Sequence, residues 1–474
     1  MNRSRADVVV VGGGTAGLAA ASELVARGRE VLLLEATSRL GGTLHVAAGH
    51  LAAAGTEAQR LAGIQDAPEA HLAEVLARTG GQVDRALVGA AVTEAPRTLE
   101  WLLAGGFDPL PGHPVLGGGG KHDDVPRTVW GAEAGRSVLA ALLVHFEVAR
   151  RTGRIEVRLE TRLASFVRSG QRIAAINCED TSGRAVSLTC EEIVLCSGGY
   201  GGSPDAFRRL SGMVPLAIAP EHADGSGILA AADVGAALRN LDRFVPTYGG
   251  IRDPERPARV HPRPFVPELD PVRRAPWEIQ VNLRGERFVA EDEPELDLRR
   301  RALLQQPGLE FWVVSDEAIQ QEAPPLFPGV DPAWVQDAFD RHPSFVRARD
   351  VAELAERTEL PADALAHTLG RYAASVASGT DPLGRKHLPR VLGEGALLAI
   401  RNHATATKGP GGVVVDEQLR VIDTDGRAFE NLRAAGEVLG GTTLSGTAFV
   451  SGMGITPAIG FGRRIGRALA RPLD

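Results

Sequence analysis

The chain has 474 residues, of which 44% are hydrophobic and 23% charged, the composition of a globular protein with a sizeable core. A formal net charge of −7 argues against non-specific binding to nucleic acid. The three cysteines are too few for a disulfide framework and have no C-x-x-C spacing, which argues against a c-type haem site, an iron–sulfur cluster or a zinc ribbon.

The N-terminus enters an apolar run almost at once and leaves no room for a signal peptide. No apolar run approaches the roughly 18 residues that suggest a membrane-spanning helix. We therefore expect a cytoplasmic protein without a membrane span.

The first 35 residues carry the pattern of a dinucleotide site. The apolar runs at residues 8–11 and 31–34 predict two strands, with a helix at 16–25 between them. Between the first strand and this helix, three glycines stand in G-x-G-x-x-G spacing, which allows a sharp turn and lets backbone N–H groups approach a pyrophosphate. Glu35 ends the second run, where a carboxylate can hold ribose hydroxyls. The predicted contacts are Gly12, Gly14, Gly17 and Glu35.

The next motifs resemble the fumarate reductase / succinate dehydrogenase flavoprotein family. Residues 41–43 are similar to its G-G-N-[ST] segment, and residues 47–50 to its A-A-G-G segment, with His50 in place of the last glycine. This resemblance, rather than the glycine spacing, implies that the nucleotide is FAD. It assigns three further cofactor contacts: Gly42, Thr43 and Gly49.

Later motifs extend the resemblance over most of the chain. Residues 197–200 are similar to the family's T-G-G-[FY], residues 435–441 to its A-G-E-x-x-G-G, and residues 224–227 to the region of its G-D-G. Residues 451–457 begin a helix whose positive N-terminus, in the family, points at the N1/O2 edge of the flavin. An alternative for Asp224 is that it only caps the following helix. The implied cofactor residues are Ser197, Gly198, Asp224, Glu437, Gly454, Ile455 and Thr456.

Succinate dehydrogenases of this family attach FAD to a histidine. Leu44 stands at that position in this chain, and His45 follows one place later. We therefore expect non-covalent FAD.

Helices are predicted at residues 56–81, with a helix start at 67–69, and at 86–104, bent at Pro96. Short alternating runs between residues 155 and 189 predict an antiparallel meander.

The segment 244–389 is richer in Pro, Arg and Glu and corresponds to the family's inserted cap. The predicted fold class is α/β: a discontinuous Rossmann-like FAD-binding domain at 1–243 and 390–474, with an inserted α+β cap domain at 244–389. The active site is expected between them.

The residues that clamp a dicarboxylate in fumarate reductases are mostly replaced. Where the family has A-H-P-T and H-H-T-M-G-G, this chain has FVPT at 244–247 and TKGPGG at 407–412. Phe449 replaces the arginine of the family's final N-R-x-G-G. Acidic residues stand where the cap arginine belongs, unless Arg299 or Arg300 takes its place by a shift. We therefore reject fumarate and succinate as substrates.

The C-terminal motif at residues 452–462 is similar, with a gap, to the ending of 3-ketosteroid dehydrogenases, so the chain resembles this branch more than true fumarate reductases. Those enzymes hold a ketone oxygen with backbone N–H groups and a tyrosine, while a second tyrosine removes the adjacent proton. Residues 449–451 replace the first tyrosine, which argues against a steroid substrate.

Two candidate catalytic residues come from the substrate-side segments. Tyr248 is the candidate for proton transfer, with a tyrosine packed under the cap as the alternative. Tyr200 is assigned to the flavin-contact turn and Tyr372 to a peripheral helix. Lys408 is a lone cation in a loop of small residues, so it either holds a substrate carboxylate or enolate or is a solvated surface lysine.

A third candidate is Arg127, which lies with His122 and Trp130 in a segment that lines the substrate side in the family. Arg127 is either an anion clamp or the partner of Asp123 or Asp124 in a salt bridge. No metal site is expected.

The sequence predicts an FAD-dependent oxidoreductase that acts on a CH–CH bond next to a carbonyl or carboxylate of a small molecule. It desaturates this bond, or reduces the activated C=C, by hydride transfer with flavin N5. A flavin oxidase or monooxygenase using O₂, and a non-redox isomerase or binding protein with structural FAD, stay open as alternatives. The chain encodes no second redox site, so electrons exchange with an external donor or acceptor, and the sequence does not give the direction.

Overall fold

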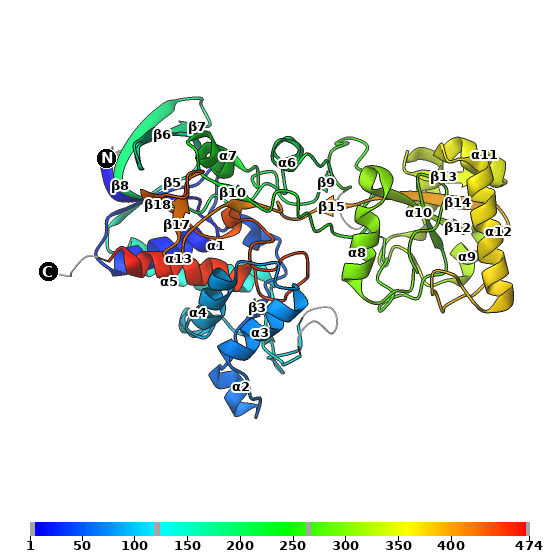
Figure 1. Cartoon of the computed structure of the whole chain (residues 1–474), viewed down its shortest axis with the longest axis horizontal. Helices are drawn as coiled ribbons and strands as arrows, with labels where there is room; N and C mark the ends of the chain where they lie inside the picture. Colours follow the sequence, from blue (N-terminus) through cyan, green and yellow to red (C-terminus); the bar gives the residue numbers. More distant parts are fainter. Residues whose placement is uncertain (1–4, 118–123, 262–266, 471–474) are drawn as a thin grey trace. The chain divides into compact units, whose positions relative to one another are not determined.

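The computed structural model describes residues 5–117, 124–261 and 267–470 (Figure 1). It divides into two compact units. Unit 1 comprises residues 1–212, 219–245 and 408–474, and unit 2 comprises residues 213–218 and 246–407. Unit 2 therefore extends beyond the cap predicted at 244–389, because the strand at Leu397–His403 pairs with strands of this unit.

Unit 1 is built on a mainly parallel sheet whose centre is the predicted N-terminal strand. Strand β1 is parallel to β2 on one side, with Val8 opposite Val31, and to β8 on the other, with Val9 opposite Ile193. The β-branched residues of β1 are fully buried, as a central strand requires. In spatial order the strands are β17 (Arg420–Ile422), β18 (Ala428–Ala434), β8 (Ala185–Leu195), β1 (Arg5–Val11), β2 (Val31–Leu34) and β5 (Ile155–Arg158).

The two ends of the chain meet in this unit. Helix α1 (Thr15–Ala26) follows β1, and helix α13 (Ile455–Ala468) packs along it (Figure 1). The approach depends on glycine: a Cβ on Gly462 would lie 2.4 Å from the carbonyl oxygen of Ala16. Helix α5 (Gly135–Arg150) also packs on α1, and α4 (Arg85–Ala104) packs on α13.

The predicted meander is confirmed. Strands β6 (Thr161–Ser169) and β7 (Arg172–Asp180) pair with each other, and β7 pairs antiparallel with β8. The helix start predicted at 67–69 is confirmed, because α3 spans Pro68–Arg78 with Ala67 as its N-cap. A continuous helix from residue 56 is wrong: α2 (Glu57–Leu61) is separate, and Gly63 between the two adopts a φ of 69°. Unit 1 also contains β3 (Leu51–Ala52), β4 (Thr128–Val129), α6 (Pro204–Ser211), α7 (Ser226–Asp233), β10 (Leu238–Arg239), β16 (Gly412–Val413) and the short helices η1 (Gly42–His45) and η3 (Glu437–Leu439).

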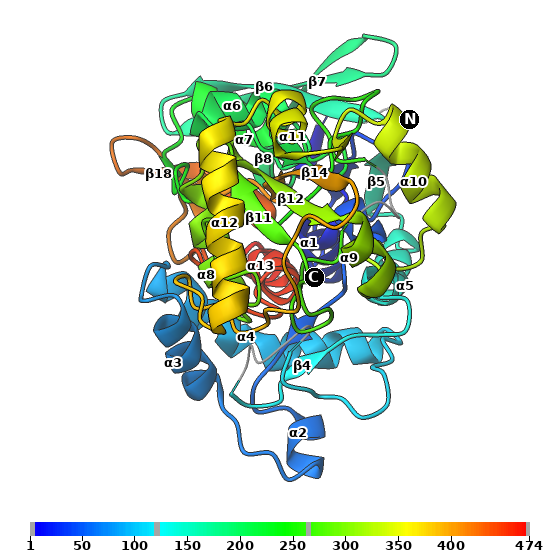
Figure 2. The same ribbon diagram turned by 90° about the vertical axis from the view of Figure 1, so that its right-hand side faces the viewer.

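Unit 2 contains an antiparallel sheet covered by helices. Its strands, in spatial order, are β11 (Ile279–Asn282), β12 (Glu310–Asp316), β14 (Leu397–His403) and β13 (Phe345–Ala348). Its helices are α8 (Leu296–Leu304), α9 (Glu317–Glu322), α10 (Pro332–Arg341), α11 (Val351–Thr358) and α12 (Ala362–Ser378). A separate parallel pair joins β9 (Leu216–Ala217) and β15 (Thr405–Ala406). In Figure 2, α12 lies in front of β11 and β12.

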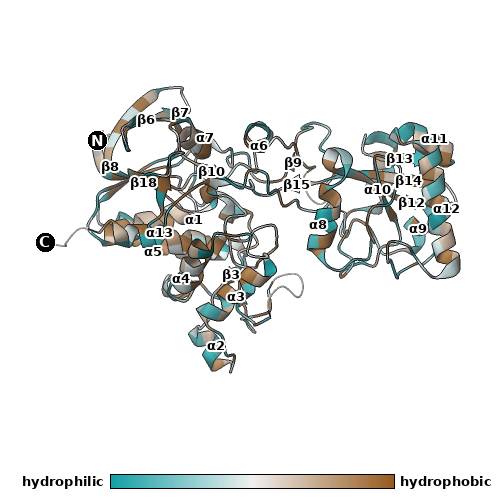
Figure 3. Ribbon diagram, viewed as in Figure 1, coloured by the Kyte–Doolittle hydropathy of each residue, from teal (hydrophilic) through white to brown (hydrophobic). Residues whose placement is uncertain are grey.

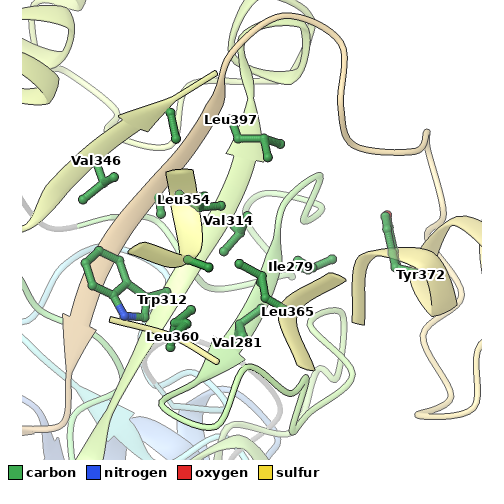
Figure 4. Close-up of a cluster of buried hydrophobic side chains, with 13 residues drawn as sticks. Ile279, Val281, Trp312, Val314, Val346, Leu354, Leu360, Leu365, Tyr372 and Leu397 are labelled. Carbon is green, nitrogen blue, oxygen red and sulfur yellow. The ribbon is translucent and has the colours of Figure 1, made fainter. Parts of the chain in front are cut away.

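Apolar side chains of the sheet and of α11 and α12 form the core of unit 2 (Figure 4). Val314 and Ile279 of the sheet, Leu354 of α11 and Leu365 of α12 are fully buried there. Tyr372, predicted to lie on a peripheral helix, is also fully buried.

A buried ion cluster adjoins that core. Glu291 accepts hydrogen bonds from Arg287 at 2.6 Å and from Arg385 at 3.1 Å, and Arg287 also pairs with Asp381 at 2.6 Å. Both guanidinium groups lie 5.2 Å from the centre of the Tyr372 ring. The acidic side chain that stands near the position of the family's cap arginine is thus already neutralised by two arginines.

Helices of both units carry hydrophobic and hydrophilic residues mixed along their length (Figure 3). Within the described ranges, no helix is both long enough and apolar enough to cross a membrane.

Candidate cofactor and active site

The turn between β1 and α1 is held by contacts that only glycine allows. Gly12 has a φ of 102°, and a Cβ there would lie 2.3 Å from the carbonyl oxygen of Cys196 at the end of β8. A Cβ on Gly17 would lie 1.8 Å from the carbonyl oxygen of Gly12. Gly14 differs, because the nearest atom to its added Cβ is Cα of Gly42 at 3.9 Å. The backbone is therefore tightly packed at Gly12 and Gly17, whereas space remains next to Gly14, where α1 begins.

Glu35 is locked to this turn. Its Oε2 accepts a hydrogen bond from the backbone N–H of Gly13 at 2.8 Å. Its Oε1 accepts from the backbone N–H of Thr37 at 2.8 Å and from the Thr37 hydroxyl at 2.7 Å. A carboxylate has about four acceptor positions, so Glu35 is oriented and retains capacity for a ribose hydroxyl.

A second glycine segment lies against the first. Gly41 has a φ of 113° and donates its N–H to the carbonyl oxygen of Gly13 at 2.8 Å. Gly42 begins the short helix η1 (Gly42–His45), in which the Thr43 side chain is half-buried. Nε2 of His45 lies 2.9 Å from the carbonyl oxygen of Leu40.

Past the end of β8, Ser197 and Gly198 leave polar groups and space for a ligand. The hydroxyl of Ser197 is buried and lacks a hydrogen-bond partner among the described residues. Gly198 has a φ of 82°, and no atom lies within 4 Å of a Cβ added to it. Asp224 accepts a hydrogen bond from the N–H of Ser226 at 2.9 Å, at the start of α7, and pairs with Arg162. The N-cap of α7 is Gly225, whose position has no side-chain capping bond, so Asp224 lies one residue before the cap. Cofactor contact by Asp224 stays a prediction.

Glu437 lies beside the same turn. It begins the short helix η3 (Glu437–Leu439), and a Cβ on Gly199 would lie 2.2 Å from its Oε1. That oxygen is buried without a partner in the described part of the chain, and burial raises the pKa of the carboxyl. The charge of Lys408 acts in the opposite direction. Ser197 and Glu437 thus present two unsatisfied buried oxygens at adjoining positions.

Lys408 is exposed and stands at the N-terminus of α13. Its Nζ lies 3.6 Å from a Cβ added to Gly454, the residue before the helix, and its stem packs on Gly441. The ammonium and the positive end of the helix dipole therefore lie together.

The N-terminus of α13 is fastened to strand β3. Thr456 is buried, and its hydroxyl accepts a hydrogen bond from the N–H of Ala52 at 3.0 Å. A Cβ on Gly452 would lie 2.3 Å from the nitrogen of Ala52. A Cβ on Gly49, which has a φ of 80°, would lie 2.3 Å from the carbonyl carbon of Ala134. The segment that includes Gly49 and the start of α13 are thus held next to each other.

Arg127 forms buried ion pairs, as the salt-bridge alternative proposed, but its partners are Asp66 and Glu74. Its Nε and Nη2 donate to Asp66 at 2.9 and 3.1 Å, and its Nη1 pairs with Glu74. Its side chain is 1% exposed. Each nitrogen already donates to a carboxylate, so the structure does not support Arg127 as an anion clamp. Asp124, one of the two partners predicted for Arg127, donates its backbone N–H to Glu74. Asp123 and His122 lie outside the described residues.

Tyr248 belongs to unit 2 and is half-buried. Its hydroxyl donates a hydrogen bond to the buried amide of Gln280, and the guanidinium of Arg299 lies 5.4 Å from its ring centre. Burial raises the pKa of this phenol well above its usual value, and Arg299 offsets only part of that effect.

Two backbone contributions were missed from the sequence. Gly13 supplies the N–H that fixes Glu35, and Gly41 supplies the left-handed turn that brings Gly42 against Gly14. The signal was present, because residues 12–14 are three consecutive glycines and residues 41–42 are two.

Tyr200 has a structural role next to the turn that contains Ser197 and Gly198. Its ring is fully buried, its hydroxyl accepts a hydrogen bond from the N–H of Gly411 at 3.2 Å, and burial raises its pKa to about 12. It serves the framework rather than proton transfer.

These features fit a dinucleotide cofactor. The open position at Gly14 suits a pyrophosphate at a helix N-terminus, the oriented carboxylate of Glu35 suits a ribose, and the unpaired oxygens of Ser197 and Glu437 lack donors that a bound cofactor would supply. Fold and site together define an α/β dinucleotide-dependent protein.

Comparison with known proteins identifies the dinucleotide. Residues 7–454 match the family described as FAD binding domain, and the chain belongs to this family. A probable fumarate reductase of Shewanella frigidimarina is 26% identical over 473 residues, which cover 98% of this chain and 74% of that protein. The 4-oxocyclohexanecarboxylate 2-dehydrogenase of Sinomonas cyclohexanicum is 27% identical over 565 residues, covering 99% of this chain and 93% of that protein.

A solved structure has the same fold. The structure of 3-ketosteroid Δ1-dehydrogenase from Sterolibacterium denitrificans aligns with a TM-score of 0.75 and 20% identity, covering 99% of this chain and 100% of that chain. The predicted α/β class and FAD-binding fold are confirmed, and the chain is an FAD-dependent oxidoreductase, related to fumarate reductases and ketosteroid dehydrogenases that act on CH–CH bonds near carbonyls.

Proposed function

We propose that this chain interconverts CH–CH and C=C bonds next to a single carbonyl or carboxylate group of a small molecule. Bound FAD supplies a hydride acceptor or donor. The chain's own residues hold the cofactor, stabilise the oxygen of the substrate and manage one proton. Electrons pass to or from a separate partner, because the sequence carries no motif for a second redox site.

The observation that supports this proposal most directly is the pairing of Lys408 with the start of α13. The Lys408 ammonium stands close to Gly454, where the helix presents its positive end. Two positive features at one point favour an oxygen that gains negative charge during the reaction, such as the carbonyl oxygen of a forming enolate. We propose that Lys408 and the N–H groups of Gly454 and Ile455 hold this oxygen.

The number of acidic groups on the substrate is inferred from the cationic side chains that the chain lacks or that other residues already bind. A dicarboxylate needs a second cationic clamp, but Phe449 replaces the family's arginine and Arg127 is consumed by Asp66 and Glu74. A relative is a 4-oxocyclohexanecarboxylate 2-dehydrogenase, so a ring ketone is the first substrate type to test.

We further propose that FAD is bound without a covalent link. Leu44, at the position where the family's succinate dehydrogenases carry the attachment histidine, has no nucleophilic group, and the ring of His45 is hydrogen-bonded at Nε2 to the carbonyl oxygen of Leu40. Denaturation in acid followed by precipitation should leave the yellow flavin in the supernatant. Flavin that stays in the precipitate would contradict this part of the proposal.

Tyr248 stays a prediction for proton transfer. Its hydroxyl is engaged with Gln280, and its raised pKa makes the phenolate scarce at neutral pH. Tyr248→Phe removes the hydroxyl and tests the role directly.

The experiment for the proposal is an anaerobic titration of FAD-loaded protein followed by its absorption spectrum. Saturated cyclic ketones, including 4-oxocyclohexanecarboxylate, are expected to bleach the oxidised flavin band and yield an α,β-unsaturated product. A protein that works in the other direction will instead be reoxidised by an enone after chemical reduction. If neither ketone nor enone changes the flavin, the proposed chemistry is wrong. Stoichiometric peroxide or a hydroxylated product would identify an oxidase or monooxygenase instead.

A further inference from the structure

An aromatic cluster of two histidines and a tryptophan lies beside the start of α13. In the pairing of β3 with β4, Leu51 faces Val129 and Ala52 faces Thr128, so His50 is next to Trp130 in the same register. The two ring centres are 4.8 Å apart. The ring centre of His113 lies 4.2 Å from that of Trp130, and the two ring planes are at 81° to each other.

The cluster is fixed in place by backbone contacts. The N–H of Leu110 donates to the carbonyl oxygen of Trp130 at 2.9 Å, and Val115 exchanges hydrogen bonds with Thr128 at 2.9 and 3.1 Å. The loop that carries His113 is therefore tied to strand β4. The ring positions follow from sheet register rather than from a free loop.

His50 also stands close to the segment that we assign to the cofactor. It follows Gly49 directly and precedes β3, whose Ala52 is fastened to Gly452 and Thr456 of the α13 N-terminus. The side chain is therefore within two residues of the contact between β3 and α13. A glycine at this position, as in the family's A-A-G-G segment, would offer no side chain there.

The chemistry of the two imidazoles is set by their surroundings. Nδ1 of His113 lies 2.9 Å from the carbonyl oxygen of Leu110, which can only accept, so Nδ1 donates this hydrogen bond. The Nε2 atom of the same ring is buried without a partner among the described residues. His50 is half-buried, and its ring has no hydrogen-bond partner in the described ranges. Burial first, and the charge of His113 second, lower the pKa of His50, so it is neutral at neutral pH.

A neutral imidazole with a free lone pair is a suitable base for a C–H that a neighbouring carbonyl acidifies. Lys408 is a cation and cannot accept a proton, while the Tyr248 hydroxyl is engaged with Gln280. His50 is the described side chain in unit 1 that combines a free nitrogen, partial burial and a position beside the α13 N-terminus.

We propose that His50 is the proton-transfer residue of this chain, with Trp130 as the wall against which the substrate lies. This proposal rests on the proposed function. In desaturation, the C–H bond α to the carbonyl breaks and its proton goes to a nitrogen of His50, while the electron pair forms the C=C bond. The β-hydrogen leaves with its electron pair as the hydride that bound FAD accepts. In the reverse direction the imidazolium returns the proton to the α-carbon.

The test separates proton transfer from redox chemistry. FAD-loaded wild type, His50→Gln and Tyr248→Phe are incubated anaerobically with 4-oxocyclohexanecarboxylate in D₂O. Two quantities are measured: deuterium incorporation α to the ketone, by NMR, and bleaching of the flavin. His145→Gln is the matched control, because His145 is also a half-buried histidine stacked on a tryptophan, with its ring 3.8 Å from that of Trp101. Bound flavin and quenching of tryptophan fluorescence by the ketone report folding and binding.

His50→Gln should slow both deuterium incorporation and bleaching by about 100-fold or more, the usual contribution of a general base, while flavin content stays at the wild-type level. His145→Gln should match the wild type. If His50→Gln exchanges and bleaches as fast as wild type, or if only Tyr248→Phe loses exchange, the assignment of His50 is wrong and the proposed function stands.

Failure of the proposed function gives a different pattern. If wild type incorporates deuterium without bleaching and His50→Gln does not, His50 is a base but the redox function is wrong. If wild type neither exchanges nor bleaches with the ketone, and its chemically reduced form is not reoxidised by the corresponding enone, both proposals are wrong.

Discussion

Substitutions in the glycine turn between β1 and α1 should separate an effect on folding from an effect on cofactor binding. Gly17→Ala adds a Cβ that would lie 1.8 Å from the carbonyl oxygen of Gly12. Real Cβ contacts are essentially never under 3.0 Å, so the start of α1 must move away from the turn by about 1.2 Å. We expect the apoprotein to lose about 1–3 kcal/mol of unfolding free energy, the range for an overpacked site.

Gly14→Ala is the matched variant. Its Cβ has no neighbour closer than 3.9 Å, and its φ of −84° suits any residue. Because Gly14 is the N-cap of α1, where alanine is disfavoured, the apoprotein should lose up to about 1 kcal/mol. The added methyl group occupies the open space that we assign to the pyrophosphate, so FAD binding should be lost.

The assay is denaturant unfolding of each protein with and without FAD. For wild type, free FAD at 100 times its Kd should add about 2.7 kcal/mol to the unfolding free energy. The same concentration should add almost nothing to Gly14→Ala. Loss of quenching of FAD fluorescence provides an independent measure of binding.

One result would refute the reasoning. If Gly14→Ala binds FAD and is stabilised by it as strongly as wild type, the space above Gly14 does not receive the cofactor. A Gly17→Ala apoprotein as stable as wild type would show that the turn is looser than the contacts indicate.

Three further predictions concern charged residues. Lys408→Met should slow flavin reduction by bound ketone about 10²–10³-fold, as for loss of one oxyanion donor, with FAD content unchanged; stopped-flow absorbance measures it. Glu291→Gln leaves buried guanidinium groups, including that of Arg385, short of a counter-charge and should cost about 3–5 kcal/mol in urea unfolding. Burial alone would raise the pKa of Asp66, but hydrogen bonds from Arg127 hold it below its usual value. The stabilisation of the folded state by ionised Asp66 is present above the unfolded pKa of about 3.9 and is lost as the pH falls through the folded pKa. The difference in unfolding free energy between wild type and Arg127→Gln should therefore narrow on acidification.

The sequence predicted the structure well where one local feature, such as a buried apolar run or a glycine turn, determines it. The β-branched run, the glycine spacing and the second apolar run predicted β1, α1 and β2 closely, because a buried parallel strand and a glycine turn leave few alternatives. The break between α2 and α3 was predicted only in part: a helix start was expected at residues 67–69, where α3 begins, but the residues around Gly63, which has a positive φ, were assigned to helix.

The charged residues show what sequence reasoning lacks. Arg127 and Asp66 are 61 residues apart in the chain, yet they form a buried pair. Proximity in sequence suggested Asp123 or Asp124 instead. Likewise, nothing in the residues around Glu291 indicates that Arg385 would neutralise it. Ion pairs of this kind depend on tertiary contacts, which spacing along the chain does not determine.

The close packing of α13 on α1 also has a consequence for biosynthesis. Residues 5–34 supply β1, α1 and β2, whereas Glu437 and Gly454 are synthesised about 400 residues later. The contacts that we assign to the nucleotide therefore come from segments far apart in the chain, and contacts of such large sequence separation form slowly. A chain that stops before the glycines of α13, such as Gly462, leaves the small-residue face of α1 uncovered. Flavin content per chain would then measure in how many molecules α13 has packed on α1, whatever their catalytic competence.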